Sequence, residues 1–181
     1  MSLARENLKS FQARVAERLK VAREKDASAS WLAVEVDGMN CLLPLSHADE
    51  VIPFSPIVPV PYVKTWFCGA INGRGRIYGV VDLAIYLALE GNQSIQNRSQ
   101  SWSITDCSLV RLNADLGLNC VLMVNKVIGL RNKENFEQTL PNLENAPSYF
   151  VARYQDSGAV TWQEINLQQL AQSKEFFSIS V

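Results

Sequence analysis

Short apolar runs separated by turn residues extend from Trp31 almost to the end of the chain, and this pattern constrains the fold most. The runs at 31–36 and 39–45 flank Asp37-Gly38, a dipeptide that favours a tight β-hairpin turn. Further runs follow at 71–83, 108–112, 118–130, 149–154 and 159–162. Strands at this density, with few helical stretches between them, predict an all-β barrel or sandwich rather than alternating strands and helices.

Helical patterns are confined to short stretches. Residues 83–89 have room for a turn or two of helix, and Asn166 with Gln169 has the spacing of a variant capping box that opens a helix through Phe176. At the N-terminus, apolar residues recur at helical spacing between charged ones, which predicts an amphipathic helix over residues 1–27. Its apolar stripe consists of Leu8, Phe11, Val15 and Leu19.

Two polar stretches indicate how the chain is organised. Residues 26–30 have the small polar composition of a linker, so residues 28–181 are predicted to form the main domain after the N-terminal helix. Residues 91–103 are rich in Asn, Gln and Ser, which indicates a solvated connection. The connection between two strand-rich lobes is therefore predicted near residues 91–107.

Composition argues against several classes of function. The chain has 17 Lys and Arg against 18 Asp and Glu, so no global field favours nucleic acid or an anionic membrane. The first residues are charged throughout and lack the apolar region of a signal peptide, and the longest apolar stretch, 120–124, is far too short to span a bilayer. These features predict a cytoplasmic protein that neither binds nucleic acid nor inserts into a membrane.

The cysteines and the single histidine do not form a recognisable catalytic or metal-binding pattern. A Cys–His nucleophile pair would need His47 with Cys68 or Cys41, and Asp82 as the orienting acid, but no spacing supports that geometry. The four cysteines lie far apart and are interpreted as small buried hydrophobic residues: Cys41, Cys68, Cys107 and Cys120. We therefore expect no enzyme activity, no metal and no cofactor.

Two further patterns argue against nucleotide binding and against acid–base catalysis. The glycines of residues 69–79 miss the dinucleotide-binding fingerprint by one residue, and no Gly-Lys-Ser/Thr follows to form a phosphate loop. They are interpreted as relieving crowding at a strand start, a bulge or a barrel corner. Asp49 and Glu50 are adjacent, so in an extended strand they would lie on opposite faces and could not pair as acid and base.

Arginines and aromatic residues gather around the glycine-rich segment. Arg74 and Arg76 are two positions apart, so in an extended strand they would share a face, either as a solvated patch or as a binding site. The aromatic residues nearby are either core residues or interface anchors, and they are Tyr62, Trp66, Phe67 and Tyr78.

The segment 58–83 resembles the signature segment of CheW-like domains. That signature has a proline-bearing loop, a G-[VA]-[IA]-N-x-R-G core and a V-[IV]-D-L close. The core and the close are matched by Gly69-Ala70-Ile71-Asn72, Arg74-Gly75 and Val80-Val81-Asp82-Leu83. Residues 49–52 and 124–130 are similar to further family motifs, so the resemblance covers about residues 31–170. Two positions depart from the family pattern, because Gly79 replaces a proline and Asn125 replaces an aspartate.

The resemblance implies a mainly β fold of two small five-stranded SH3-like barrels packed side by side, with the N-terminal helix and a short C-terminal helix. It implies an adaptor without an active site, which binds the cytoplasmic hairpin tip of a methyl-accepting chemoreceptor in an apolar groove between the barrels. A separate surface would bind the regulatory domain of a CheA-like histidine kinase. Within the family, the chain most resembles the twitching-motility member, which implies control of type IV pili.

The resemblance also assigns a binding site, in which Arg74 and Glu50 are expected to form an ion pair. The residues expected to bind the partner protein are Arg74, Asn72, Gly75, Glu50, Ala48 and Val51. The main alternative is an SH3-like module that binds proline-rich peptides through Tyr62, Trp66 and Tyr78.

Overall fold

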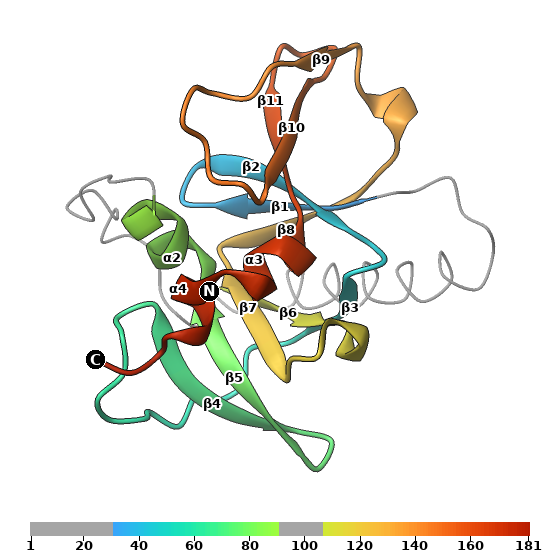
Figure 1. The fold of residues 1–181 in the computed structure, drawn as a ribbon. Coiled ribbons are helices and arrows are strands. Elements are labelled where there is room, and N and C mark those ends of the chain that lie inside the picture. Colours follow the sequence, from blue (N-terminus) through green and yellow to red (C-terminus); the bar gives the residue numbers. More distant parts are fainter. Residues whose placement is uncertain (1–30, 91–106) are drawn as a thin grey trace.

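Two curled β-sheets lie one above the other in the computed structural model, which describes residues 31–90 and 107–181 (Figure 1). The six-stranded sheet has the order β8 (Lys126–Arg131), β1 (Trp31–Val36), β2 (Met39–Pro44), β11 (Thr161–Ile165), β10 (Phe150–Gln155) and β9 (Gln138–Leu140). The five-stranded sheet has the order β3 (Ala48–Ile52), β6 (Ser108–Leu112), β7 (Cys120–Val124), β5 (Arg76–Asp82) and β4 (Phe67–Gly73). The mainly β prediction with two small sheets is confirmed, although one sheet has six strands rather than five.

The predicted hairpin at the start of the domain is formed by β1 and β2. Their register runs from Trp31 opposite Pro44 to Val36 opposite Met39. The two turn residues have positive φ angles, 47° at Asp37 and 81° at Gly38, as a two-residue turn that follows the strand twist requires. The dipeptide between the apolar runs therefore fixes both the turn and the register.

β7 is buried along its whole length because each of its faces meets an apolar layer. Val121 and Met123 face a cluster enclosed by the five-stranded sheet, whereas Leu122 and Val124 join a second cluster shared by both sheets. β1 alternates in the same way between the shared cluster and the interior of its own sheet. The shared cluster is called the shared core below, and it joins the two sheets into one body.

The predicted lobe boundary near residues 91–107 is wrong. That segment follows β5 and α2 (Leu83–Glu90) and precedes β6, and both strands belong to the five-stranded sheet. The chain instead builds β1 and β2, leaves to form the whole five-stranded sheet, and returns with β8 to β11. A polar stretch indicates a connection between elements, but its composition does not determine which sheet the next strand joins. The predicted structures of residues 1–27, 26–30 and 91–103 fall outside the described residues.

Short helices complete the shared core. The predicted helical turns at residues 83–89 correspond to α2, where Asp82 Oδ1 accepts a hydrogen bond of 3.1 Å from the backbone N–H of Ile85. The predicted C-terminal helix is divided into α3 (Leu167–Gln172) and α4 (Lys174–Phe177) at Ser173. Among the described residues, no helix has the length and apolar character needed to cross a membrane.

The capping box predicted at the start of α3 is only half formed. The Asn166 side chain accepts hydrogen bonds from the backbone N–H groups of Gln168 and Gln169. The backbone N–H of Asn166 donates to the carbonyl of Tyr149 at 2.8 Å instead of to a side chain at the third helical position. The helix start is thereby anchored to the segment that leads into β10.

Three of the four cysteines are buried, as predicted: Cys41, Cys107 and Cys120. Cys68 is half-buried, and all four are free thiols. Burial raises the pKa of the Cys41 thiol and raises the pKa of Cys120 to about 12. The thiolate form that a nucleophile or metal ligand needs is therefore disfavoured at both buried positions.

Candidate protein-binding site

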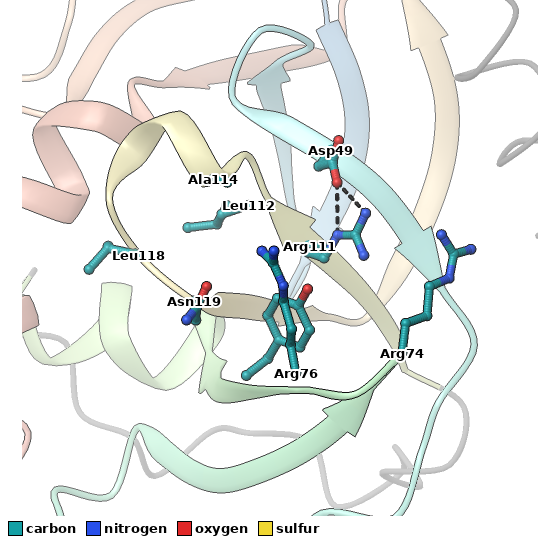
Figure 2. Close-up of a pocket in the computed structure, with 9 residues that line it drawn as sticks. Asp49, Arg74, Arg76, Arg111, Leu112, Ala114, Leu118 and Asn119 are labelled. Atoms are coloured by element: carbon teal, nitrogen blue, oxygen red, sulfur yellow. Dashed lines mark hydrogen bonds and ion pairs between the residues drawn. The ribbon is translucent and has the colours of Figure 1, made fainter.

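Arg74 stands at the tip of the β4–β5 hairpin rather than within a strand. Arg74 and Gly75 have φ angles of 51° and 79°, so they form the turn, and β5 begins at Arg76. The sequence interpretation that Arg74 and Arg76 share a strand face is therefore wrong. The two side chains diverge, with Arg74 reaching toward β3 and Arg76 extending over the surface beside β6 (Figure 2).

The expected ion pair between Arg74 and Glu50 is confirmed. Arg74 Nη2 lies 2.8 Å from Glu50 Oε1, and the side chains are 77% and 26% exposed, respectively. Glu50 belongs to β3, which lies at the opposite edge of the five-stranded sheet from β4. The pair therefore connects the β4–β5 hairpin to the other edge of this curled sheet.

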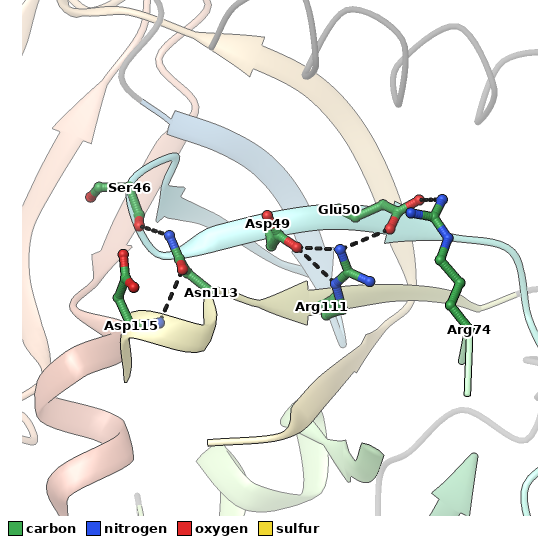
Figure 3. Close-up of polar contacts among 7 residues, drawn as sticks. All are labelled: Ser46, Asp49, Glu50, Arg74, Arg111, Asn113 and Asp115. Atoms are coloured by element: carbon green, nitrogen blue, oxygen red, sulfur yellow. Dashed lines mark hydrogen bonds and ion pairs between the residues drawn. The ribbon is translucent and has the colours of Figure 1, made fainter. Parts of the chain in front are cut away.

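A second arginine, Arg111 on β6, holds the same carboxylate from the other side (Figure 3). Arg111 Nη2 lies 3.0 Å from Glu50 Oε2, and Arg111 Nε donates to Asp49 Oδ2 at 2.8 Å. Arg111 Nη2 also contacts Asp49 Oδ2. Arg74, Glu50, Arg111 and Asp49 form a continuous network, called the arginine–carboxylate network below.

Asp49 and Glu50 do not lie on opposite faces, as an extended strand would place them. The register between β3 and β6 shifts between Ala48 and Glu50, which indicates a bulge. The bulge allows both neighbouring carboxylates to reach Arg111. The same edge is fixed further along, where Asn113 Nδ2 donates to the carbonyl of Ser46 at 3.1 Å.

Arg111 was not identified from the sequence. The signal that could have found it is a single arginine within the otherwise uncharged run of β6. Burial by itself would lower the pKa of Arg111, but the hydrogen bond to Asp49 and the charges of Asp49 and Glu50 outweigh burial and raise it. The guanidinium therefore keeps its charge and holds both carboxylates at neutral pH.

A hollow of about 250 Å³ lies beside the arginine–carboxylate network (Figure 2). Its lining comes from the five-stranded sheet and the β6–β7 connection, and consists of Asp49, Arg74, Arg76, Tyr78, Arg111, Leu112, Ala114, Leu118 and Asn119. The resemblance implies an apolar groove between the two barrels, close to Arg74. The space next to Arg74 is instead this hollow. The shared core packs between the sheets, and the hollow next to Arg74 is charged and belongs to one sheet.

The remaining predicted binding residues divide into two groups. Asn72 and Gly75 are exposed near the hairpin tip. Ala48 and Val51 are only 0% and 5% exposed and belong to the shared core. These two side chains face the inside of the sheet, so a contribution of Ala48 and Val51 to partner binding stays a prediction.

The aromatic residues near the hairpin are mostly core residues. Trp66 is 3% exposed and stacks on Phe176 of α4, with ring centroids 5.7 Å apart. Tyr78 is 8% exposed and lies beneath the Arg111 guanidinium. Tyr62, at 86%, is the aromatic of this group that stands fully exposed.

Asp82 and His47, the residues that a Cys–His nucleophile pair would need beside a cysteine, lie in a helix cap and a turn, respectively. Asp82 binds the start of α2, and His47 lies in the turn between β2 and β3, where burial lowers its pKa. Within residues 31–90 and 107–181, no three His, Cys, Asp or Glu side chains gather as a metal site would require.

The fold and the site define a two-sheet β domain with an exposed hairpin tip, where Arg74 is held in place by its ion pair with Glu50. The chain belongs to the CheW-like domain family, whose model matches residues 30–175. It is 26% identical over 174 residues to Protein PilI of Pseudomonas aeruginosa, which covers 93% of this chain and 89% of that protein.

The fold is also that of a solved structure, the scaffolding protein TtCheW from Thermoanaerobacter tengcongensis. The two superpose with a TM-score of 0.60 at 19% identity, over 81% of this chain and 94% of that one. At this identity the likeness concerns the fold.

Proposed function

We propose that the chain is a cytoplasmic, non-enzymatic adaptor that couples a methyl-accepting chemoreceptor to a CheA-like histidine kinase. Its family membership and its similarity to PilI support a role in chemotaxis-like signalling that controls type IV pilus twitching motility. The shared core supports a scaffold role, because two sheets joined by one apolar layer can present separate surfaces in a fixed orientation.

The observation that carries the proposal is that ion pairs hold the Arg74 side chain in one orientation. Its side chain is 77% exposed, yet Glu50 holds it and Arg111 holds Glu50 in turn. An exposed ion pair contributes only about 0.2 to 1 kcal/mol to stability. Because the Arg74–Glu50 pair stabilises the fold so little, its hold by a network of two strands and the β4–β5 turn is better explained by orientation: the network presents the Arg74 guanidinium in one direction to an incoming helical hairpin.

The alternative, an SH3-like module for proline-rich peptides, is less well supported. Such modules bind their peptides in a groove lined by exposed aromatic rings. Trp66 and Tyr78 are buried here, and only Tyr62 of the three aromatic residues is available. Titration against a polyproline peptide and against a helical receptor hairpin separates the two functions, and we expect binding of the hairpin alone.

Arg74→Ala is expected to weaken binding of the receptor hairpin about tenfold, or about 1.4 kcal/mol, while the free energy of unfolding falls by less than about 1 kcal/mol. The affinity falls because the guanidinium is lost from the binding surface, and stability hardly changes because the pair is exposed. Calorimetry measures the affinity and urea denaturation the stability. Lys126→Ala, which removes an exposed charge from the other sheet, serves as the control. An affinity equal to that of the unaltered chain would contradict the assignment of Arg74.

Cys68 is expected to react with iodoacetamide at neutral pH no faster than glutathione does, and Cys41 and Cys120 are expected to remain unmodified in the folded protein. The two buried thiols are inaccessible and have raised pKa values. Mass spectrometry of peptides from timed reactions measures each rate. Reaction of Cys68 well above the glutathione rate would reveal an activated thiolate and favour a Cys68 hydrolase over an adaptor.

A further inference from the structure

Arg76 has a different status from the other two arginines that line the hollow. Arg74 and Arg111 are occupied by Glu50 and Asp49. Arg76 is exposed, and its side chain forms no hydrogen bond or ion pair within residues 31–90 and 107–181. Three guanidinium groups face two carboxylates in this region, so one positive charge remains uncompensated, and it is located at Arg76.

Two neutral groups that can donate hydrogen bonds line the same hollow. The side chains of Tyr78 and Asn119 have no hydrogen-bond partner among the described residues. The backbone carbonyl of Asn119 accepts from Gly79 at 2.9 Å, which holds the residue beside β5 and leaves its side-chain amide available. A guanidinium, a hydroxyl and an amide around one hollow favour a ligand that accepts several hydrogen bonds and carries negative charge.

The other side of the hollow is apolar. Leu112 and Leu118 contribute to its lining, and its volume is about 250 Å³. The combination suits a side chain with an aliphatic stem and a carboxylate at its end, because the stem packs on the leucines while the carboxylate faces the guanidinium.

We propose that this hollow receives an acidic side chain, a glutamate, of the partner protein, and that Arg76 binds its carboxylate. The partner is the helical hairpin of the proposed function, on which this step of the inference rests, because Arg74 borders the same hollow. Arg74 would orient the hairpin, and Arg76 would select an acidic position along it. Arg76 is thus a specificity residue outside the arginine–carboxylate network.

The first test needs no partner protein. The chain is labelled with ¹⁵N and titrated with N-acetyl-glutamate methylamide, which has one carboxylate, or with the neutral glutamine analogue. We expect the signals of the Arg76 side chain and the Asn119 amide to shift with the glutamate compound only. The shift of the Asn119 amide should disappear in Arg76→Ala and persist in Lys126→Ala. No shift, an equal shift with the glutamine analogue, a shift that survives Arg76→Ala, or tighter binding of inorganic phosphate than of the glutamate compound would overturn the proposal.

The second test separates this inference from the proposed function. Arg76→Ala is expected to weaken hairpin binding about fivefold to tenfold, Arg76→Glu more, and Arg76→Lys less. If the hairpin binds and Arg74→Ala weakens it, while Arg76→Ala behaves like Lys126→Ala, the role of Arg76 is refuted and the adaptor function stands. If the hairpin does not bind but the glutamate compound shifts the expected signals, the adaptor function fails and the carboxylate site stands.

Discussion

Gly69→Ala is expected to lower the free energy of unfolding by about 3 kcal/mol or more, a large part of the stability of a domain this size. Gly69 has a φ angle of 132°, which side-chain-bearing residues rarely adopt. A Cβ atom there would also lie 2.2 Å from the carbonyl oxygen of Val58. Val58 cannot move away easily, because its N–H and its carbonyl each form a 2.8 Å hydrogen bond with Ala70. Urea denaturation measures the loss.

Gly75→Ala is the matched control for Gly69→Ala. Gly75 also has a positive φ angle, 79°, but a Cβ atom there would meet no other atom within 4 Å. Its replacement should therefore cost only the backbone strain of about 1 kcal/mol. Equal losses for the two variants would show that the close approach of Val58 to β4 is not the cause.

The local features of the fold could be predicted because they depend on residues close together in the sequence. Asp37 and Gly38 determine the first hairpin. Asn166 is the N-cap of α3, so the helix begins where the sequence predicts. Gly69 lies at a register shift between β4 and β5, as the interpretation of crowding at a bulge requires. Each of these features depends on a preference for particular φ angles or for a hydrogen bond within a few residues.

The β4–β5 turn could not be predicted because Arg74, its first residue, is not a residue type that favours such a turn. Residues 71–83 form one apolar run in the sequence, but the chain reverses at Arg74, a non-glycine residue with positive φ. Turns of this kind favour Asn, Asp or Gly at that position, so an arginine there gives no signal. The error carried over to Arg76, which was placed on the same face as Arg74.

The binding site could be predicted only in part, because its contacts join residues far apart in the sequence. The Arg74–Glu50 pair was expected from the resemblance to the family, and the structure contains it. Arg111 comes from β6, and only the sheet order brings it to Glu50. Ala48 and Val51 were expected at the binding site because they flank Glu50 in the family motif, but a motif does not determine which face of its strand is buried, and both side chains are buried.

Arg111→Met is expected to lower the free energy of unfolding by about 2 kcal/mol and to weaken hairpin binding about tenfold. The variant keeps an apolar side chain beside Tyr78 but leaves Asp49 and Glu50 next to each other without the cation that binds both. The side chains of all three residues are only 18% to 27% exposed, so water compensates the two carboxylates only in part. Glu50, no longer held from β6, would also cease to fix the direction of Arg74.

The loss of stability and the loss of affinity can be separated with the triple variant Arg111→Met, Asp49→Asn, Glu50→Gln. Neutral amides remove the repulsion between the two carboxylates, so most of the lost stability should return. The affinity should not return, because the neutral amide that replaces the Glu50 carboxylate would form no ion pair with Arg74. Urea denaturation and calorimetry on the two variants and the unaltered chain measure both quantities. Recovery of affinity together with stability would mean that Arg111 acts on binding only by keeping the domain folded, and that the direction in which Glu50 holds Arg74 has no part in recognition.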